Sequence, residues 1–137
     1  MKELGFYLHI PFCKSKCIYC DFNSFAQKDD CIEPYIKAVK KEIEEYAKQN
    51  KDVLIKTIYI GGGTPSYIKE KYIKEIIETI RSNFEIIPNA EITIEINPGT
   101  VNRRKLNTYY KAGINRLSIG LQSTNDKLLK QLGRVHD

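Results

Sequence analysis

Short apolar runs alternate with helical periodicities along the chain. Four runs rich in branched and aromatic residues predict buried strands, over residues 4–10, 53–60, 91–96 and 117–121. After each run, apolar residues recur every three or four positions and predict a helix. These helices are marked at about 30–50, 72–84, 106–110 and 128–132. Four strand–helix units in this order are typical of an α/β protein with a parallel sheet and right-handed crossovers.

Local signals mark several element ends. Pro11 stops the first strand, and Gly113 is a natural stop for the third helix. Asp30, with Glu33 three residues later, predicts a capping box for the first helix, and Pro34 suits its first turn. No internal repeat, low-complexity stretch or linker interrupts the pattern, so the sequence predicts one domain.

The unusual segments all follow predicted strands. Cysteines follow the first strand, Gly61-Gly62-Gly63-Thr64-Pro65 follows the second, Glu95 and Asn97 end the third, and Gln122 follows the fourth. In parallel sheets and barrels these positions share one face, where ligands bind. Four units are about half of a barrel of roughly 250 residues. We therefore expect residues 1–137 to be the N-terminal part of a longer barrel protein, with the remaining strands and a C-terminal domain absent.

The cysteines indicate a metal centre with thiolate ligands. Cys13, Cys17 and Cys20 have the spacing Cys-x3-Cys-x2-Cys, and three thiolates this close can surround one soft metal centre. A structural zinc site would need a fourth ligand, from Cys31 or His9. The spacing also departs from the bacterial ferredoxin run. An iron–sulfur cluster held by three cysteines, with one iron open to a small molecule, fits best. We expect Cys31 to be a buried or half-exposed thiol at a helix start, and His9 a satisfied histidine at a strand end.

The composition excludes several classes of protein. The 137 residues are 42% apolar and 28% charged, which is ordinary for a folded domain and excludes a disordered chain. The net charge of +5 is spread along the chain and does not indicate a nucleic-acid partner. No apolar run approaches the roughly 18 residues of a membrane span, and residues 1–5 show no secretory signal. We therefore expect a cytoplasmic protein with no membrane span.

Polar residues at the strand ends are candidates for ligand contacts. The run 61–63 matches neither a dinucleotide loop nor a Walker loop, so it either makes a tight turn or lets a ligand approach the backbone. Glu95 shares a strand face with Thr93, and a carboxylate inside a packed barrel needs a partner such as an amine or ribose hydroxyls. Gln122 would supply neutral donor and acceptor groups. Arg134 either pairs with a ligand carboxylate or is exposed near a helix end.

The cysteine loop, Cys13-x3-Cys17-x2-Cys20 with Tyr19 before the last cysteine, resembles that of the radical S-adenosylmethionine (SAM) superfamily. The resemblance implies a partial (β/α) TIM-like barrel that holds a [4Fe-4S] cluster. In that superfamily SAM binds the open iron through its amino and carboxylate groups, and an electron from the cluster cleaves it to a 5′-deoxyadenosyl radical. The resemblance also implies that the Gly-Gly-Gly-Thr-Pro segment presents backbone groups to the SAM amino group.

Four blocks together resemble one family more narrowly. They are Tyr7-x-His9-Ile10-Pro11-Phe12-Cys13 with the rest of the cysteine loop, Gly61-Gly62-Gly63-Thr64-Pro65, Glu95-x-Asn97-Pro98, and Ser118-Ile119-Gly120-x-Gln122-Ser123. This set is similar, over essentially the whole chain, to the oxygen-independent coproporphyrinogen III oxidase (dehydrogenase) family. The resemblance implies that Cys13, Cys17 and Cys20 hold the cluster. It implies SAM contacts at Tyr7, Tyr19, Gly62, Gly63, Thr64, Glu95, Gln122 and Arg134.

The family has two branches, and two departures favour the second. The dehydrogenase branch converts two porphyrinogen propionates to vinyl groups. It carries a fourth loop cysteine, where this chain has Phe22, and a longer segment before the cluster. The chain is therefore more similar to the haem chaperone branch, whose members bind haem and are described as passing it to apoproteins. This implies haem or porphyrinogen as ligand, a flavodoxin- or ferredoxin-type electron donor and a haem-accepting apoprotein. An active dehydrogenase and a structural zinc-binding domain are the alternatives.

Overall fold

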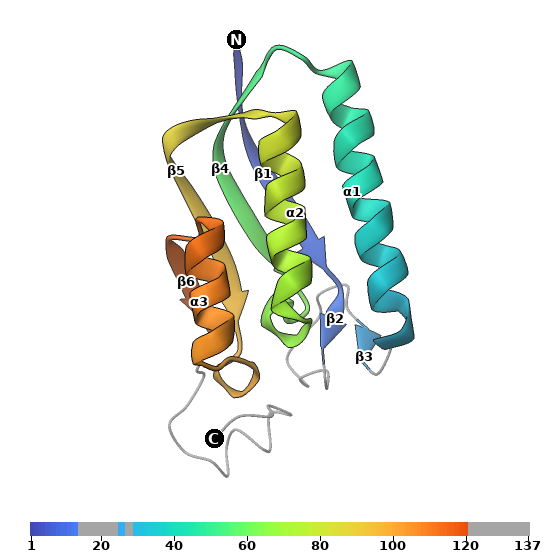
Figure 1. Ribbon diagram of the computed structural model, residues 1–137, viewed down its shortest axis with the longest axis vertical. Coiled ribbons are helices and arrows are strands. Elements are labelled where there is room, and N and C mark those ends of the chain that lie inside the picture. Colours follow the sequence, from blue (N-terminus) through green and yellow to red (C-terminus); the bar gives the residue numbers. More distant parts are fainter. Residues whose placement is uncertain (14–24, 27–28, 121–137) are drawn as a thin grey trace.

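The computed structural model describes residues 1–13, 25–26 and 29–120 (Figure 1). Its strands are β1 (Lys2–Ile10), β2 (Phe12–Cys13), β3 (Phe25–Ala26), β4 (Val53–Gly62), β5 (Glu85–Ile96) and β6 (Arg116–Ile119). Its α-helices are α1 (Ile32–Gln49), α2 (Glu70–Asn83) and α3 (Arg103–Ala112). Three short 3-10 turns are η1 (Asp29–Cys31), η2 (Pro65–Tyr67) and η3 (Pro98–Thr100).

The main sheet has four strands in the order β1-β4-β5-β6, and every neighbouring pair is parallel. Each strand connects to the next through one helix, as parallel pairing requires. The helices lie side by side over one face of the sheet (Figure 1). The structure confirms the α/β class and the parallel sheet that the sequence predicts. A second parallel pair, β2 with β3, was not predicted because its strands are two residues long.

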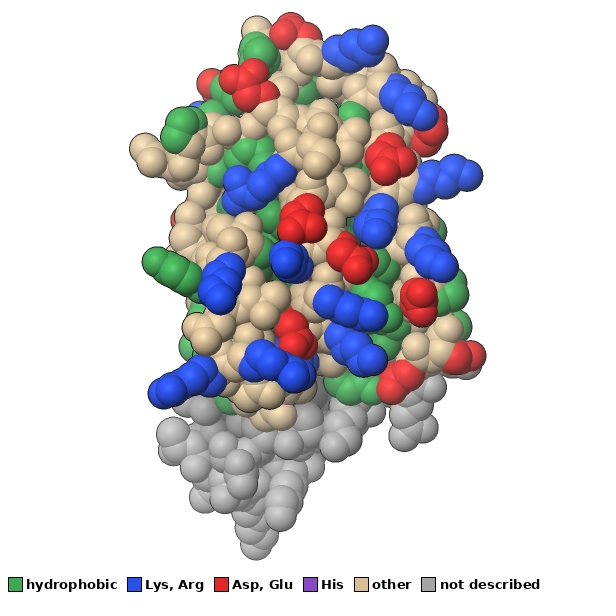
Figure 2. Space-filling view, viewed as in Figure 1, with side chains coloured by type: hydrophobic (Ala, Val, Ile, Leu, Met, Phe, Trp, Pro, Cys, Tyr) green, Lys and Arg blue, Asp and Glu red, His purple; other side chains and the backbone are tan. Residues whose placement is uncertain are grey.

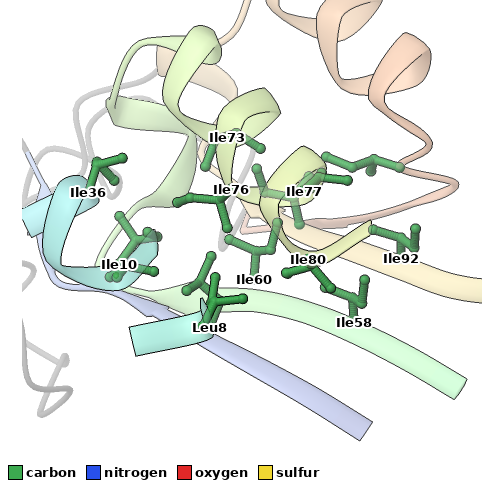
Figure 3. Close-up of a cluster of buried hydrophobic side chains, with 14 of the residues drawn as sticks. Leu8, Ile10, Ile36, Ile58, Ile60, Ile73, Ile76, Ile77, Ile80 and Ile92 are labelled. Atoms are coloured by element: carbon green, nitrogen blue, oxygen red, sulfur yellow. The ribbon is translucent and has the colours of Figure 1, made fainter. Parts of the chain in front are cut away.

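The core lies between the sheet and the helices and consists largely of isoleucine (Figure 3). Ile58 and Ile60 of β4 lie beneath Ile76, Ile77 and Ile80 of α2, and each is 1% exposed or less. Strand alternation places every second β4 residue on this face, and the helical period places the α2 isoleucines on one stripe. Burying one such side chain stabilises the fold by about 1.5–3 kcal/mol. This packing fixes the strands whose ends carry the candidate site.

The opposite face of the sheet carries polar and aromatic side chains in register. Tyr7 of β1 pairs with Tyr59 of β4, and Tyr59 pairs with Thr93 of β5. One row nearer the carboxyl ends, Glu95 of β5 pairs with Ser118 of β6. These residues alternate with the buried ones beneath the helices, as the strand period requires. The prediction that Thr93 and Glu95 share a face is therefore confirmed.

Strand boundaries extend beyond the apolar runs. β1 begins at Lys2, and β4 continues through Gly62 because backbone pairing with β1 does not require apolar side chains. β5 begins at Glu85, and its pairing with β4 shifts register between Ile55 and Thr57. Pro88 falls in the unpaired stretch of β5, where its missing N–H costs no ladder bond.

The observed helix ends can be compared with the capping and stop signals predicted from the sequence. The predicted capping box is wrong: Cys31 is the N-cap of α1 and no side chain caps it, because the η1 turn containing Asp30 leads directly into the helix. Gly113 ends α3 as predicted, with φ of 104° and its N–H directed at the Tyr109 and Tyr110 carbonyl oxygens. The predicted fourth helix lies outside the described residues. Within the described ranges, no helix is long and apolar enough to cross a membrane.

Candidate functional site

The carboxyl ends of β1, β4 and β5 bring the described candidate residues together. Cys13 is the last residue of β2, just beyond β1; the loop 62–64 begins at the last residue of β4; and Glu95 is the penultimate residue of β5. The Thr64 N–H donates to the Phe12 carbonyl oxygen at 2.7 Å, and the Gly62 N–H donates to Glu95 Oε1 at 3.0 Å. The predicted convergence at one sheet edge is therefore confirmed for these residues.

The glycine loop packs directly against the backbone that leads to Cys13. Gly62 has φ of +117°, and a Cβ there would lie 2.8 Å from the Ile10 carbonyl oxygen. A Cβ on Gly63 would lie 2.8 Å from the Phe12 carbonyl oxygen, whereas its N–H donates to Ile10 at 2.8 Å. Glycine is required here because two backbones approach each other closely. The sequence left open that a ligand approaches the backbone of this loop. In the described residues it is the backbone at Ile10 and Phe12 that approaches it.

Glu95 is half-buried and rests over Gly61. Its Oε1 occupies the space that a Gly61 side chain would fill, so a larger residue at 61 would push the carboxylate away from Gly62. The Gly62 N–H supplies a hydrogen bond to this oxygen. A carboxylate placed beside a glycine-lined loop can accept hydrogen bonds from an amine or from hydroxyl groups.

Tyr7 faces the same space as Glu95. Its side chain is 58% exposed, so it is not a core residue of the described sheet. Burial raises the pKa of Tyr7 and the charge on Glu95 raises it further. The Tyr7 hydroxyl lies 3.1 Å from His9 Nδ1, and the His9 carbonyl oxygen accepts a hydrogen bond from Tyr35. His9 is therefore the satisfied strand-end histidine that the sequence predicts.

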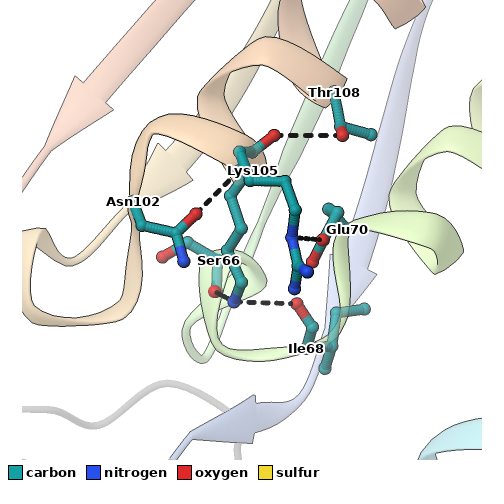
Figure 4. A network of polar contacts seen from close by, with 7 residues as sticks. Ser66, Ile68, Glu70, Asn102, Lys105 and Thr108 are labelled. Carbon is teal, nitrogen blue, oxygen red and sulfur yellow. Dashed lines mark hydrogen bonds and ion pairs between the residues drawn. The ribbon is translucent and has the colours of Figure 1, made fainter.

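A polar network that the sequence did not reveal ties the η2 turn, which follows the glycine loop, to α3 (Figure 4) and to the end of β5. Ser66 Oγ accepts from the Asn97 N–H at 3.0 Å and lies 2.5 Å from Thr100 Oγ1. Lys105 Nζ donates to the carbonyl oxygens of Ser66 at 2.6 Å and of Ile68 at 3.3 Å. Burial lowers the pKa of Lys105. Because these partners lie about 30 to 40 residues apart, no local pattern marks them.

Cys13 is buried at 5% exposure, beside a tyrosine–aspartate pair. The Tyr67 hydroxyl donates to both carboxylate oxygens of Asp29 at 2.7 Å. That hydrogen bond, followed by burial and by the charges of Asp29 and Cys13, raises the pKa of Tyr67 to about 12. Cys31 lies at a helix start as predicted, since it is the N-cap of α1, but its thiol is exposed, so the prediction of a buried or half-exposed thiol is wrong.

Five predicted site residues lie outside the described residues: Cys17, Tyr19, Cys20, Gln122 and Arg134. Within the described ranges, no three His, Cys, Asp or Glu side chains gather to hold a metal ion. Cys13 is thus the one member of the predicted cysteine triplet whose surroundings the structure gives.

The described edge suits a cationic, hydrogen-bonding ligand. The N–H groups of Gly62, Gly63 and Thr64 all donate to protein oxygens, so they are already paired within the protein. The Glu95 carboxylate beside them can accept hydrogen bonds from an ammonium group. The Thr93 hydroxyl, on the same face, is buried without a partner among the described residues. These groups fit the amino end of SAM, and the buried Cys13 thiol suits a soft metal ligand.

A parallel α/β sheet carries Cys13, a glycine loop and the Glu95 carboxylate at one edge, as the resemblance to radical SAM proteins implies. The family model of the radical SAM superfamily matches residues 7–137. The chain belongs to the radical SAM superfamily.

Within this superfamily, the chain is similar to proteins of known name. The chain is 42% identical to the heme chaperone HemW of Haemophilus influenzae and 40% identical to HemW of Escherichia coli, over 100% and 99% of its length. It spans 37% and 36% of those proteins, so it covers about a third of the curated relatives it matches. The solved coproporphyrinogen III oxidase HemN of Escherichia coli superposes with a TM-score of 0.90 at 30% identity, over 99% of this chain and 31% of that one. The predicted family resemblance and barrel type are confirmed.

Proposed function

We propose that residues 1–137 form the N-terminal part of a radical SAM core domain, with the remaining strands and a C-terminal domain in the rest of the protein. Cys13, Cys17 and Cys20 hold a [4Fe-4S] cluster. SAM is bound by Tyr7, Tyr19, Gly62, Gly63, Thr64, Glu95, Gln122 and Arg134. When bound, cluster and SAM supply a one-electron route to an organic radical, fed by a flavodoxin- or ferredoxin-type donor.

The observation that carries this proposal is the convergence at the sheet edge. Cys13, the loop 62–64 and Glu95 come from three strands and are joined by short hydrogen bonds through Phe12 and Gly62. The loop N–H groups are paired within the protein, so the acceptor that these residues present to an amine is the Glu95 carboxylate. Glu95 adds a negative charge on the same side, which favours a cationic amine.

For the whole protein, the function we favour is that of a haem chaperone, which binds haem and passes it to an apoprotein. Identities of 42% and 40% to proteins named heme chaperone, against 30% to the solved oxidase, support this choice. Phe22 stands where the dehydrogenase branch carries its fourth loop cysteine, which also supports it. The second candidate is porphyrinogen dehydrogenation, which the TM-score of 0.90 to a coproporphyrinogen III oxidase supports.

The first experiment tests the cluster and its open iron. The full-length protein is purified anaerobically, reconstituted with iron and sulfide, reduced, and examined by electron paramagnetic resonance with and without SAM. We expect a [4Fe-4S] signal that changes when SAM is added. Cys20→Ser should lose the cluster, whereas the matched control Cys31→Ser, at an exposed helix cap, should keep it. Stoichiometric zinc without iron or sulfide would overturn the proposal.

The second experiment separates the two branches. Haem is titrated into the same protein and followed by its visible absorbance, and porphyrinogen consumption is measured anaerobically with SAM and a reductant. A chaperone binds haem and leaves porphyrinogen unchanged. Sustained formation of vinyl products would instead establish the dehydrogenase.

A further inference from the structure

Tyr59 is a phenol on the face of the sheet opposite the helices, and the predicted site does not use it. It is half-buried on β4, two residues before Gly61. Its ring stacks on Tyr7, with centroids 6.1 Å apart and an interplanar angle of 20°. The pairing register also places it opposite Thr93 of β5. The ring is therefore held from two neighbouring strands.

The hydroxyl end of Tyr59 interacts with Glu95 and Ser118. Burial is the largest cause that raises the pKa of Tyr59; the charge of Glu95 and a side-chain hydrogen bond to it raise the pKa further. A hydrogen bond with Ser118 acts in the opposite direction and lowers it. The phenol end of Tyr59 and the Glu95 carboxylate therefore interact, with the Ser118 hydroxyl beside them.

Gly61 makes this meeting possible. A Cβ at Gly61 would lie 2.9 Å from Cε1 of Tyr59 and would also overlap Oε1 of Glu95. The phenol ring and the carboxylate therefore share the space above one glycine. The Gly62 N–H donates to the same Oε1 at 3.0 Å, so two groups of β4, this N–H and the Tyr59 phenol, lie against one carboxylate. Ser118 of the neighbouring strand β6 pairs with Glu95 and lies on its other side.

We propose that Tyr59 is a positioning residue that holds the carboxylate of Glu95 in the orientation that contacts SAM. The inference rests on the proposed function, because it is there that Glu95 is assigned to SAM. A glutamate side chain has several rotatable bonds, and ordering them opposes binding unless the protein fixes them beforehand. The Tyr59 hydroxyl and the Gly62 N–H fix them from one strand, before any ligand arrives.

The test is a double-mutant cycle on SAM affinity in the reconstituted full-length protein. Tyr59→Phe keeps the ring stacked on Tyr7 and removes the hydroxyl alone. We expect it to weaken SAM binding by about tenfold, as for loss of a hydrogen bond to a charged group. In a Glu95→Ala background the same change should alter SAM affinity by less than about twofold. Tyr110→Phe, which removes an equivalent hydroxyl from a residue that is 79% exposed on α3, is the matched control.

The outcomes separate this inference from the function on which it rests. If wild-type protein does not bind SAM, the proposed function fails and the positioning role fails with it. If wild type binds SAM and Tyr59→Phe binds it equally well, the positioning role alone is overturned. An equal loss with and without Glu95 would also overturn it, because the hydroxyl would then act independently of the carboxylate. The urea unfolding midpoint of Tyr59→Phe should match that of Tyr110→Phe.

Discussion

Gly62→Ala tests whether the glycine loop is fixed by its contact with β1. Gly62 has φ of +117°, a conformation that costs an L-residue about 1–2 kcal/mol. The added Cβ would also lie 2.8 Å from the carbonyl oxygen and 2.9 Å from the nitrogen of Ile10. These are backbone atoms of a paired strand, so relief requires a backbone shift costing about 1–3 kcal/mol. We expect a total loss of about 2–5 kcal/mol in the free energy of unfolding.

Gly113→Ala is the matched control for backbone conformation. Gly113 also has a positive φ, of +104°, at the C-terminus of α3. A Cβ there would meet the Nη2 end of Arg81, a flexible side chain that can rotate away. We therefore expect only the conformational cost, about 1–2 kcal/mol. Gly113 is not part of the proposed site, so SAM affinity should not change in this variant.

Urea unfolding of the full-length protein measures the loss of stability in each variant, and SAM titration measures the change in SAM affinity. Gly62→Ala should lose more stability than Gly113→Ala and should also weaken SAM binding, because the loop that carries Thr64 must move. Equal stability losses in the two variants would refute the reasoning, since the steric contact between the added Cβ and the Ile10 backbone would then cost no free energy.

Three further changes test other parts of the structure. Because burial lowers the pKa of Lys105, the unfolded chain binds that proton more tightly and stability should rise as pH approaches 10.5; urea unfolding of Lys105→Met should lack this rise. Asp29→Asn should bring the pKa of Tyr67 down from about 12, as followed by phenolate absorbance with Tyr67→Phe as reference. Ile119 is 57% exposed on β6 and pairs with Ile96 on the face that the helices cover. We expect a further helix of the full-length protein to bury it, so Ile119→Ala should cost about 2–4 kcal/mol; a loss below about 0.5 kcal/mol would contradict this.

The elements that follow from periodicity were predictable. Alternation in β5 predicted that Thr93 and Glu95 share one face of the strand, and the structure has them there, opposite Ile92 and Ile94. Parallel strands end at a common edge, so the sequence predicted that Glu95 and the glycine loop share one face, and the two are hydrogen-bonded in the structure. These predictions depend only on strand and helix geometry, so one sequence was enough.

What could not be predicted depends on partners distant in sequence. Lys105 reads as an ordinary helix lysine, yet its ammonium bonds the carbonyl oxygens of Ser66 and Ile68. In the sequence Tyr59 is an ordinary strand aromatic. Its contact with Glu95 is visible only in the structure, where Gly61 leaves room for the carboxylate. The capping box failed for a different reason. A short turn before α1 replaced the side-chain cap, and the motif carries no signal of that turn.

The loop after β4 has two tasks that explain its composition together. Toward β1, Gly62 and Gly63 let two backbones touch, and the Gly63 and Thr64 N–H groups fasten the segment that leads to Cys13. Toward β5, the missing side chain of Gly61 admits the Glu95 carboxylate. Since protein groups already satisfy the loop N–H groups, a ligand need not order them. Binding then draws on a preformed edge, which reduces the entropic cost of association.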